Sequence, residues 1–266
     1  MRPLLIVLLI FYSPSLLAQK QGQARIDSFL QELPKLKDDT NKVKLLSRVS
    51  FSCSRLNPRA GIKYGEECLA MAIKLKWDKG IAAGYNSIGV NYWSQSNNDT
   101  ALDYFKKALI INKKIDNKTG EAQNLGNIGL LYNNQSDYPK ALEYIFVALK
   151  IFEGLNDKNG IANQLGNIGN IYRAQKNYTK ALYYDSLSLV QYQDLGDKAG
   201  EAIELGNMGN IYHDLVNIEK ALSNHFKALK MCEELGLKRS IGTGLMNMGD
   251  LYSEQHKYHK ALELKF

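Results

Sequence analysis

Proline and regular alternation of apolar residues are both scarce in this chain. Only 5 of its 266 residues are proline, the residue that most strongly interrupts a helix. Valine and isoleucine do not alternate with polar residues over any sustained stretch, as they would in half-buried strands. The two absences together favour helix over sheet.

Cysteine is also scarce, with only Cys53, Cys68 and Cys232 present. An odd number leaves at least one thiol free or paired with another molecule, and the spacings match no zinc site. If Cys53 and Cys68 lie on two helices of one hairpin, they are offset by about 9 Å along the helix axes. That offset argues against a disulfide between them on geometric grounds, and we expect all three to be small buried apolar side chains.

The positive charge is not concentrated anywhere. The formal net charge is +7, and the tightest basic clusters are the pairs Lys106–Lys107 and Lys113–Lys114. A nucleic-acid-binding face gathers lysine and arginine on one stripe. The dispersed pattern predicts a solvated surface and no nucleic-acid partner.

A long apolar run occurs only at the start, in MRPLLIVLLIFYSPSLLAQK. Arg2 precedes a short apolar stretch that ends at Ser13 and Pro14, and Ala18 follows as a small residue. This is the layout of a secretory signal peptide, and it is shorter than the roughly 20 apolar residues of a membrane span. The sequence predicts a signal peptide at 1–18 cleaved after Ala18, a periplasmic or secreted chain without a stable span, and a leader at 19–38 with a short helix at 24–36.

A forty-residue repeat organises the rest of the chain. The segments LGNIGLLY, LGNIGNIY and LGNMGNIY begin at residues 125, 165 and 205. The units predicted from this register are 39–78, 79–118, 119–158, 159–198, 199–238 and an incomplete unit at 239–266. Apolar residues recur twice per unit at helical spacing, with polar turns between them, so each unit is predicted to be a pair of antiparallel helices.

This pattern resembles the tetratricopeptide repeat in a forty-residue form. The small–aromatic–small columns of that family are carried by Gly129, Tyr132, Ala141 and Ala148 and their equivalents. The resemblance implies an all-α, right-handed superhelical solenoid whose first helices line the concave surface. It also implies a likeness to the exported sensor regions of bacterial signalling proteins, which precede a kinase, cyclase or DNA-binding module.

Glycine recurs inside the predicted first helices, where it costs roughly 0.5–1 kcal/mol relative to alanine. One column faces the alanine column of the partner helix, and we expect it to allow close helix packing. Its members are Gly89, Gly129, Gly169, Gly209 and Gly249. A second set, Gly126, Gly166 and Gly206, lies three residues earlier, on a neighbouring strip of the helix.

Asparagine recurs beside these glycines. Its amide both donates and accepts hydrogen bonds, so a regularly spaced ladder suits the backbone of an extended peptide. The ladder comprises Asn127, Asn167, Asn207 and Asn247, with Asn170 and Asn210 further along the helices. The alternative is that these amides bond across neighbouring first helices. Trp93, Arg173 and His213 share one further column and are candidates either for ligand contacts or for surface positions.

No pattern indicates catalysis, a cofactor or a metal. GNIGN matches part of a dinucleotide fingerprint but lacks the preceding strand, and His256 and His259 have no nearby third ligand. His225 falls in an aromatic core column, while Asp185 and Ser188 replace the Phe105 and Ala108 of the second unit, so we expect poorer packing there.

The leading hypothesis is a non-enzymatic scaffold of the bacterial envelope that binds a protein or peptide segment in its concave groove. The alternative is a truncated sensor that self-associates, with the incomplete last unit as one possible contact. A hydrolase is the least favoured class.

Overall fold

The computed structural model describes the backbone of residues 14–257 and 259–260, with side chains from residue 22 onward. These residues form twelve α-helices and one short 3₁₀ helix. The elements are α1 (Pro14–Glu32), η1 (Leu33–Lys35), α2 (Thr40–Cys53), α3 (Pro58–Lys74), α4 (Asp78–Ser94), α5 (Asn98–Lys114), α6 (Lys118–Asn134), α7 (Tyr138–Gly154), α8 (Lys158–Ala174), α9 (Tyr178–Leu195), α10 (Lys198–Asp214), α11 (Ile218–Glu234) and α12 (Lys238–Glu254).

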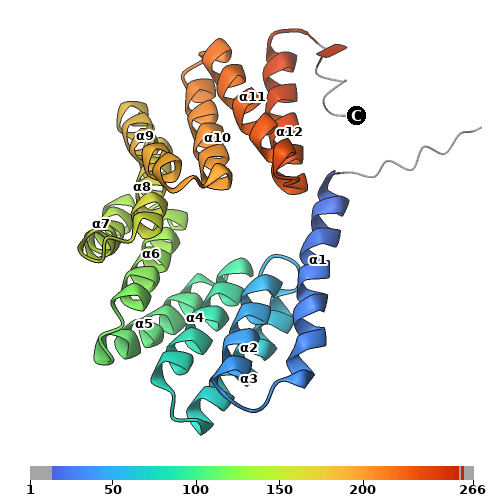
Figure 1. Ribbon diagram of the computed structural model, residues 1–266. Coiled ribbons are helices and arrows are strands. Elements are labelled where there is room, and N and C mark those ends of the chain that lie inside the picture. The colour runs from blue at the N-terminus through green and yellow to red at the C-terminus, as the bar shows by residue number, and fades with distance from the viewer. Residues whose placement is uncertain (1–13, 258, 261–266) are drawn as a thin grey trace, which may run out of the picture.

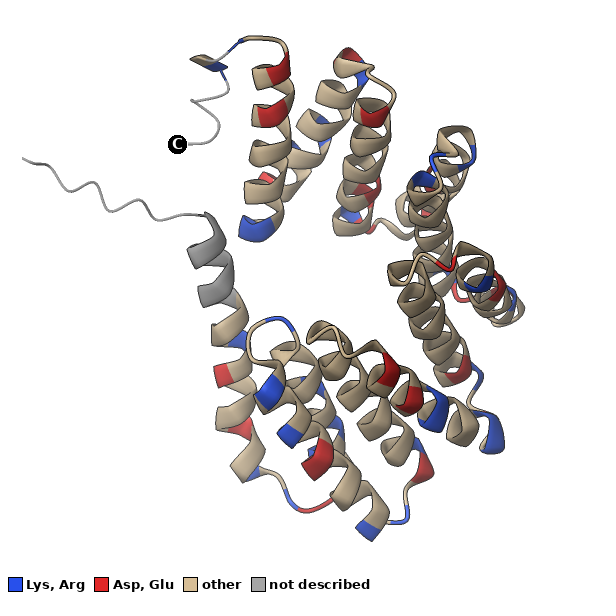
Figure 2. Cartoon of the chain, turned by 180° about the vertical axis from the view of Figure 1, so that it is seen from behind, with Lys and Arg blue, Asp and Glu red and all other residues tan. Residues whose placement is uncertain are grey.

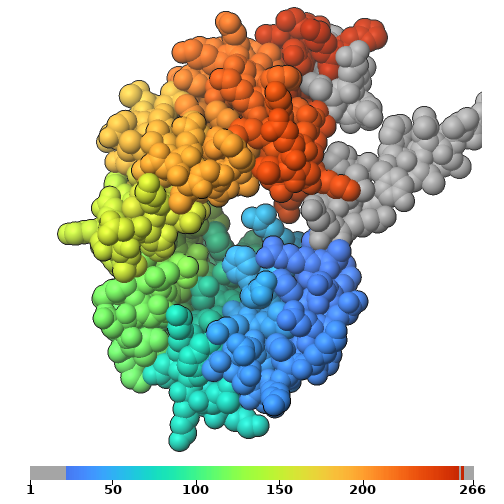
Figure 3. Space-filling model, viewed as in Figure 1, coloured from blue at the N-terminus to red at the C-terminus, as the bar shows by residue number. Residues whose placement is uncertain are grey.

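Consecutive helices pack as antiparallel pairs, which confirms the all-α repeat architecture expected from the sequence. Figure 1 shows α4, α6, α8 and α10 on the inner side of the curved array, with α5, α7, α9 and α11 on the outer side. The curvature brings the two ends of the array together, since α1 contacts α12. Figure 3 shows the hollow that the array encloses. The inner helices therefore present one continuous surface to a central space.

The turns between helices repeat every twenty residues. A residue with φ between 51° and 66° lies in each turn from Lys76 to His256. Only Gly196 and Gly236 among them are glycine, although the left-handed region disfavours side chains with a Cβ. Most of the following helices begin at an Asn or Asp whose side chain accepts a backbone N–H, as Asp157 does from Gly160. Such N-caps satisfy donors that the helix itself leaves unpaired.

The core lies between the inner and outer helices of each unit. Alanines of the second helix are fully buried, as at Ala101, Ala141 and Ala181. Ile145 and Ile168 are also fully buried and belong to one apolar cluster with Leu165 and Ile171. Small residues on one helix and branched ones on the other bring the two helices close while excluding water.

The leading helix differs from the short element expected at 24–36. Helix α1 is 19 residues long and begins at Pro14, and a 3₁₀ turn containing Pro34 replaces its expected last turn. Proline lacks the N–H that would continue the helical ladder, which explains the early end. The predicted cleavage position after Ala18 lies within α1, while residues 1–13 of the predicted signal peptide lie outside the described residues.

The cysteines confirm their expected role. Cys53, Cys68 and Cys232 are all buried and free, and burial raises the pKa of the Cys68 thiol to about 12.

Charged side chains are scattered over many helices rather than gathered on one face (Figure 2). Among the described helices, none is both long enough and apolar enough to cross a membrane. Residues 258 and 261–266 of the incomplete last unit lie outside the described part.

Candidate functional site

The first glycine column lies where the inner and outer helices of a unit approach each other. A Cβ on Gly129 would sit 2.5 Å from Ile145 and 3.0 Å from the Ala141 carbonyl, and one on Gly89 would sit 2.7 Å from Phe105. Gly169 and Gly209 face Asp185 and His225 in the same way, and Gly249 is buried on α12. At the first four of these glycines a side chain larger than hydrogen would collide with the partner helix, so one of the two helices would have to move.

The second set of glycines has another geometry. A Cβ on Gly126 would sit 3.0 Å from Oε1 of Gln164, and one on Gly166 would sit 2.5 Å from Oε1 of Glu204. Each glycine thus makes room for a polar side chain of the next inner helix. We call the two spaces the α6–α8 slot, filled by Gln164, and the α8–α10 slot, filled by Glu204. Gly206 has no such neighbour within 4 Å.

Sequence reasoning missed these slot residues. They form the forty-residue column Gly84, Asn124, Gln164, Glu204 and Gly244. Asn124, Gln164 and Glu204 are 1%, 6% and 3% exposed, although polar side chains usually face solvent. A polar residue recurring two positions before each second-set glycine was the available signal.

The asparagine ladder divides into bonded and unbonded amides. Asn127 donates to Asn86 Oδ1 at 2.9 Å, and Asn247 donates to Asn210 Oδ1 at 3.3 Å, so both join neighbouring inner helices. These two bonds are the cross-helix contacts of the alternative interpretation. Asn207 donates to Glu204 on its own helix at 3.3 Å.

Two members of the ladder retain their full hydrogen-bonding capacity. Asn167 is half-buried and Asn170 is exposed, both on α8, and neither makes a side-chain hydrogen bond to the described part of the chain. Each therefore has one carbonyl oxygen and two N–H groups free for a ligand. The unbonded amides occupy the inner helix at the middle of the array.

The column of Trp93, Arg173 and His213 connects successive units. The Arg173 guanidinium donates to both carboxylate oxygens of Asp214, at 2.6 and 3.3 Å. His213 lies 2.9 Å from Glu254 one unit later, and Trp93 packs against the apolar cluster around Phe105. All three side chains have intramolecular partners on the inner helices or beside them.

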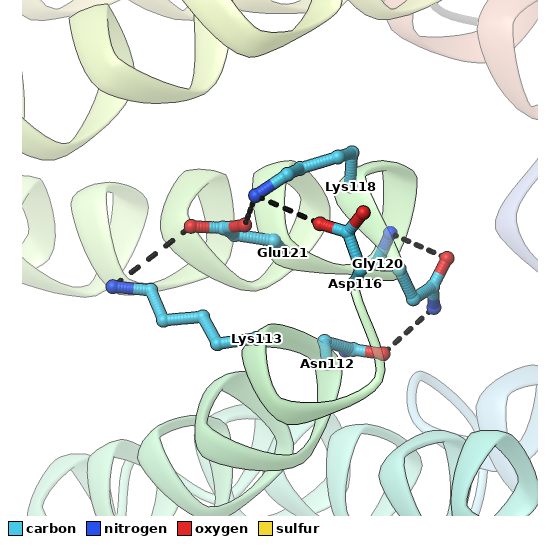
Figure 4. Close-up of polar contacts among 7 residues, drawn as sticks. Asn112, Lys113, Asp116, Lys118, Gly120 and Glu121 are labelled. Carbon is cyan, nitrogen blue, oxygen red and sulfur yellow. Dashed lines mark hydrogen bonds and ion pairs between the residues drawn. The ribbon is translucent and has the colours of Figure 1, made fainter.

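Two buried glutamates at the start of inner helices are paired with lysines. Figure 4 shows Glu121 between Lys113 and Lys118, whose Nζ atoms lie 3.8 and 3.2 Å from its carboxylate oxygens. Glu201, the equivalent residue of α10, lies 2.7 Å from Lys198. A compensating cation offsets much of the cost of burying a carboxylate.

Three other buried ionisable groups have no such compensation. Asp185 is fully buried and neither of its carboxyl oxygens has a hydrogen-bond partner; burial and the nearby Glu204 raise its pKa to about 8. Burial raises the pKa of Glu204 to about 7, against the opposing effect of a hydrogen bond from Asn207. Burial lowers the pKa of His225 to about 4, and its Nε2 has no partner. All three lie on helices α9 to α11.

The described residues contain no group of three or more His, Cys, Asp or Glu side chains able to hold a metal ion.

Ser188, predicted to weaken packing, donates to the Ala162 carbonyl at 2.9 Å. Its hydroxyl is therefore satisfied, whereas the Asp185 carboxyl in the same helix is not.

Comparison with known proteins finds a family model and related folds. The tetratricopeptide repeat model matches residues 80–154 and 160–234, which is more than half of the chain. No curated protein matches the sequence.

Several solved structures have a similar fold, and three of them show the range of proteins that share it. Aspartyl phosphate phosphatase F from Bacillus subtilis has a TM-score of 0.68 at 17% identity, over 94% of this chain and 68% of its own. NprR in complex with its cognate peptide NprX has a TM-score of 0.62 at 21% identity, over 92% and 72%. A signal transduction ATPase with a tetratricopeptide repeat sensor from Pyrococcus horikoshii has a TM-score of 0.64 at 16% identity, over 94% and 40%. At these identities the likeness shows the fold alone.

Proposed function

The chain belongs to the tetratricopeptide repeat family, and we propose from this premise that its inner face binds an extended peptide or protein segment. The observation that carries the proposal is the amide-bearing inner surface around the central hollow, where the Asn167 and Asn170 side chains have no hydrogen-bond partner in the described part of the chain. Carboxamides recognise the backbone N–H and C=O of an extended segment whatever its side chains are. NprR, one of the proteins with a similar fold, is described in complex with its cognate peptide.

The proposal makes this chain a non-enzymatic sensory scaffold. The successive inner helices supply a long surface of repeated geometry. The spacing of packed helices, about 8–10 Å, matches the length of roughly three residues of an extended segment. A protein with a tetratricopeptide repeat sensor shares the fold, which supports a sensory role. A phosphatase shares it too, so an activity assay with phosphoaspartyl substrates belongs among the tests.

Peptide capture tests the proposal directly. A display library of random linear peptides is selected on the purified chain and on the variant in which Asn127, Asn167 and Asn207 are all alanine. Each net hydrogen bond contributes about 1 kcal/mol, so three lost bonds weaken binding by roughly 100-fold. Unchanged capture by the triple variant would contradict the proposal.

The division of the asparagine ladder into bonded and unbonded amides provides a sharper variant, and an outer helix provides a matched control. Asn224 is a half-buried residue of outer helix α11 whose amide donates to the Lys220 carbonyl, so Asn224→Ala leaves capture unchanged. The double variant Asn167→Ala, Asn170→Ala removes only amides without intramolecular partners. It weakens capture without lowering the melting temperature.

Export to the periplasm is the second part of the proposal. It is supported by the apolar start of the sequence and the small residue Ala18. Cell fractionation and the mass of the mature N-terminus test it: a chain that begins at Gln19 in the periplasmic fraction is expected. A cytoplasmic chain with residues 1–18 attached contradicts it.

Self-association is a second candidate function, favoured by exposed apolar side chains on two successive outer helices. Phe146 and Val147 of α7 and Tyr183, Leu187 and Val190 of α9 are 37–59% exposed. Clustered exposed apolar side chains often mark interaction surfaces. Sedimentation at several concentrations separates the candidates, because a peptide-binding monomer keeps one mass while a self-associating sensor does not.

A further inference from the structure

Three glutamates of the inner helices are buried, and only one of them lacks a cation. Glu121 and Glu201 are 8% and 5% exposed, and each lies within 4 Å of at least one lysine. Glu204 is 3% exposed, and no lysine or arginine in the described part of the chain forms an ion pair with it. The chain thus compensates two of these carboxylates and leaves the third without a counter-charge.

The ionisable group beside Glu204 is a second acid rather than a cation. Asp185 of α9 lies close enough for Glu204 to raise its pKa. Arg173 of α8 is the nearby cation, and its Nε and one terminal nitrogen donate to the Asp214 carboxylate. The α8–α10 slot therefore holds a carboxyl group beside a second acid, and no residue in the described part of the chain forms an ion pair with it.

Glu204 lies between inner helices α8 and α10, and an amide of its own helix covers one of its oxygens. Its side chain lies against Gly166, where a Cβ would sit 2.5 Å from Oε1. Its Oε2 accepts a 3.3 Å hydrogen bond from the Asn207 amide, and Asn207 belongs to the predicted ligand ladder. Rotation of the Asn207 side chain frees this oxygen and simultaneously turns the amide toward the central hollow.

The neighbouring α6–α8 slot also holds an acceptor without a donor. Gln164 is only 6% exposed, and its Oε1 has no hydrogen-bond partner in the described part of the chain. This oxygen lies 3.0 Å from the position of a Cβ on Gly126. Two successive slots between inner helices thus hold oxygen acceptors, one without a partner at Gln164 and one bonded by the Asn207 amide at Glu204.

From this geometry we propose that Glu204 selects a cationic group of the bound segment, either a Lys or Arg side chain or the N-terminal amino group. This inference rests on the proposed peptide-binding function and specifies its ligand. The cation donates to the Glu204 carboxylate in place of Asn207, and the released Asn207 amide bonds the ligand backbone beside it. Hydrogen bonds between charged groups are about twice as strong as neutral ones, so this contact contributes specificity as well as affinity.

The test compares captured peptides that differ by one charge. Each lysine or arginine of a selected peptide is replaced by glutamine, and the N-terminus is acetylated in a separate arm, which distinguishes the two sources of the cation. One of these changes weakens binding to the wild-type chain by about tenfold or more. The same change has little effect on binding to Glu204→Gln, because the carboxylate is absent there.

The fold provides both a tolerant substitution and a matched control. Gln164 shows that a glutamine fits over a glycine in the preceding slot, so Glu204→Gln is accommodated, which melting curves verify. Glu201→Gln removes the same charge one turn earlier on α10, from a carboxylate already paired with Lys198. The control keeps the preference for a cationic peptide.

The pH dependence supplies an independent readout. Because the pKa of Glu204 is raised to about 7, its carboxylate takes up a proton between pH 8 and pH 6, while lysine remains charged. Affinity of the wild-type chain for a peptide whose cation is lysine or arginine falls over this interval, and it falls more steeply than that of Glu204→Gln, in which the neighbouring Asp185 still titrates.

The outcomes separate the two proposals. Failure to capture any peptide overturns the proposed function and this assignment with it. Capture of peptides without a cationic preference, or a preference that survives Glu204→Gln, overturns this assignment alone and leaves the peptide-binding function standing.

Discussion

The junction formed by α2, α3 and α4 and the junction formed by α8 to α11 bury polar groups in contrasting ways. At the first junction the groups are neutral and most of them are hydrogen-bonded, although Asn91 Oδ1 is buried without a partner in the described part of the chain. Asn91 Nδ2 lies within 3.2 Å of the Ser50 carbonyl, the Ser50 hydroxyl and the Ser87 carbonyl, and Ser50 donates to the Gly61 carbonyl at 2.6 Å. These bonds join three helices.

At the second junction the buried groups are ionisable and poorly bonded. Asp185 and His225 occupy the core column in which Phe105 and Ile145 stand earlier in the chain. Their orphaned polar atoms make this part of the repeat costlier to bury. The comparison teaches that one repeat can supply a junction held rigidly by neutral hydrogen bonds and another whose stability follows pH.

Overpacking the first junction has the largest expected effect. A Cβ on Gly61 would overlap the Asn91 side chain, so Gly61→Val displaces Asn91 and leaves its buried amide without partners. We expect a loss of about 3–5 kcal/mol in unfolding free energy, from strain and lost hydrogen bonds. Urea denaturation measures it. Gly154→Ala, where a Cβ meets nothing within 4 Å, is the control and loses nothing.

Replacing the buried acid of the second junction tests its cost. Asp185→Ile restores the residue type of Ile145 and removes an unpartnered carboxyl, so we expect a gain of about 2–4 kcal/mol at pH 8. The pKa of Asp185 is raised from 3.8 to about 8, so its protonated form stabilises the fold at low pH, and this stability is lost as pH rises through about 8. Urea denaturation from pH 5 to pH 8 shows the pH dependence weakened in the variant.

The control for Asp185 lies on the same helix. Asp194 is 52% exposed and pairs with Lys158 at 3.3 Å, so Asp194→Asn changes stability by less than about 1 kcal/mol. If Asp185→Ile is no more stable than wild type at pH 8, the burial argument for this junction is wrong.

The buried histidine gives the opposite dependence on pH. The pKa of His225 is lowered from 6.5 to about 4 by burial, with smaller contributions from His213 and Arg173. Its stabilising contribution is present above pH 6.5 and lost as pH falls through about 4. Relative to His225→Phe, the wild-type chain loses about 2–3 kcal/mol over that interval, measured by urea denaturation at each pH. A constant difference between the two proteins contradicts this.

Two glycines of α10 provide the smallest contrast. A Cβ on Gly206 meets nothing within 4 Å, whereas one on Gly209 would lie 2.8 Å from the His225 ring. We expect Gly206→Ala to raise stability by about 0.5–1 kcal/mol through helix propensity. Gly209→Ala lowers it by about 1–3 kcal/mol through overpacking. Thermal melts of the two variants compare them directly, and equal shifts rule out the packing explanation.

Much of the fold was predictable because the repeat imposes the same local pattern many times. The spacing of apolar residues predicted the helix pairs, and the column containing Gly129 faces its partner helix as expected. The slots filled by Gln164 and Glu204 were not predicted, because the recurring polar column marks these positions but does not show that their side chains reach the preceding inner helix. The length of α1 was also underestimated, since its apolar start was read only as a targeting signal.

The sequence by itself determined the period, the helix pairs and the close approach of glycine to the partner helix, because these depend on contacts within one unit. Only the tertiary structure decided which asparagines are bonded and which acidic groups lack a partner. The physical reason is that hydrogen bonding and charge compensation depend on side chains brought together from different units by the curvature of the array. Two asparagines in equivalent positions, Asn127 and Asn167, therefore differ because only Asn127 has a bonding partner in the preceding unit.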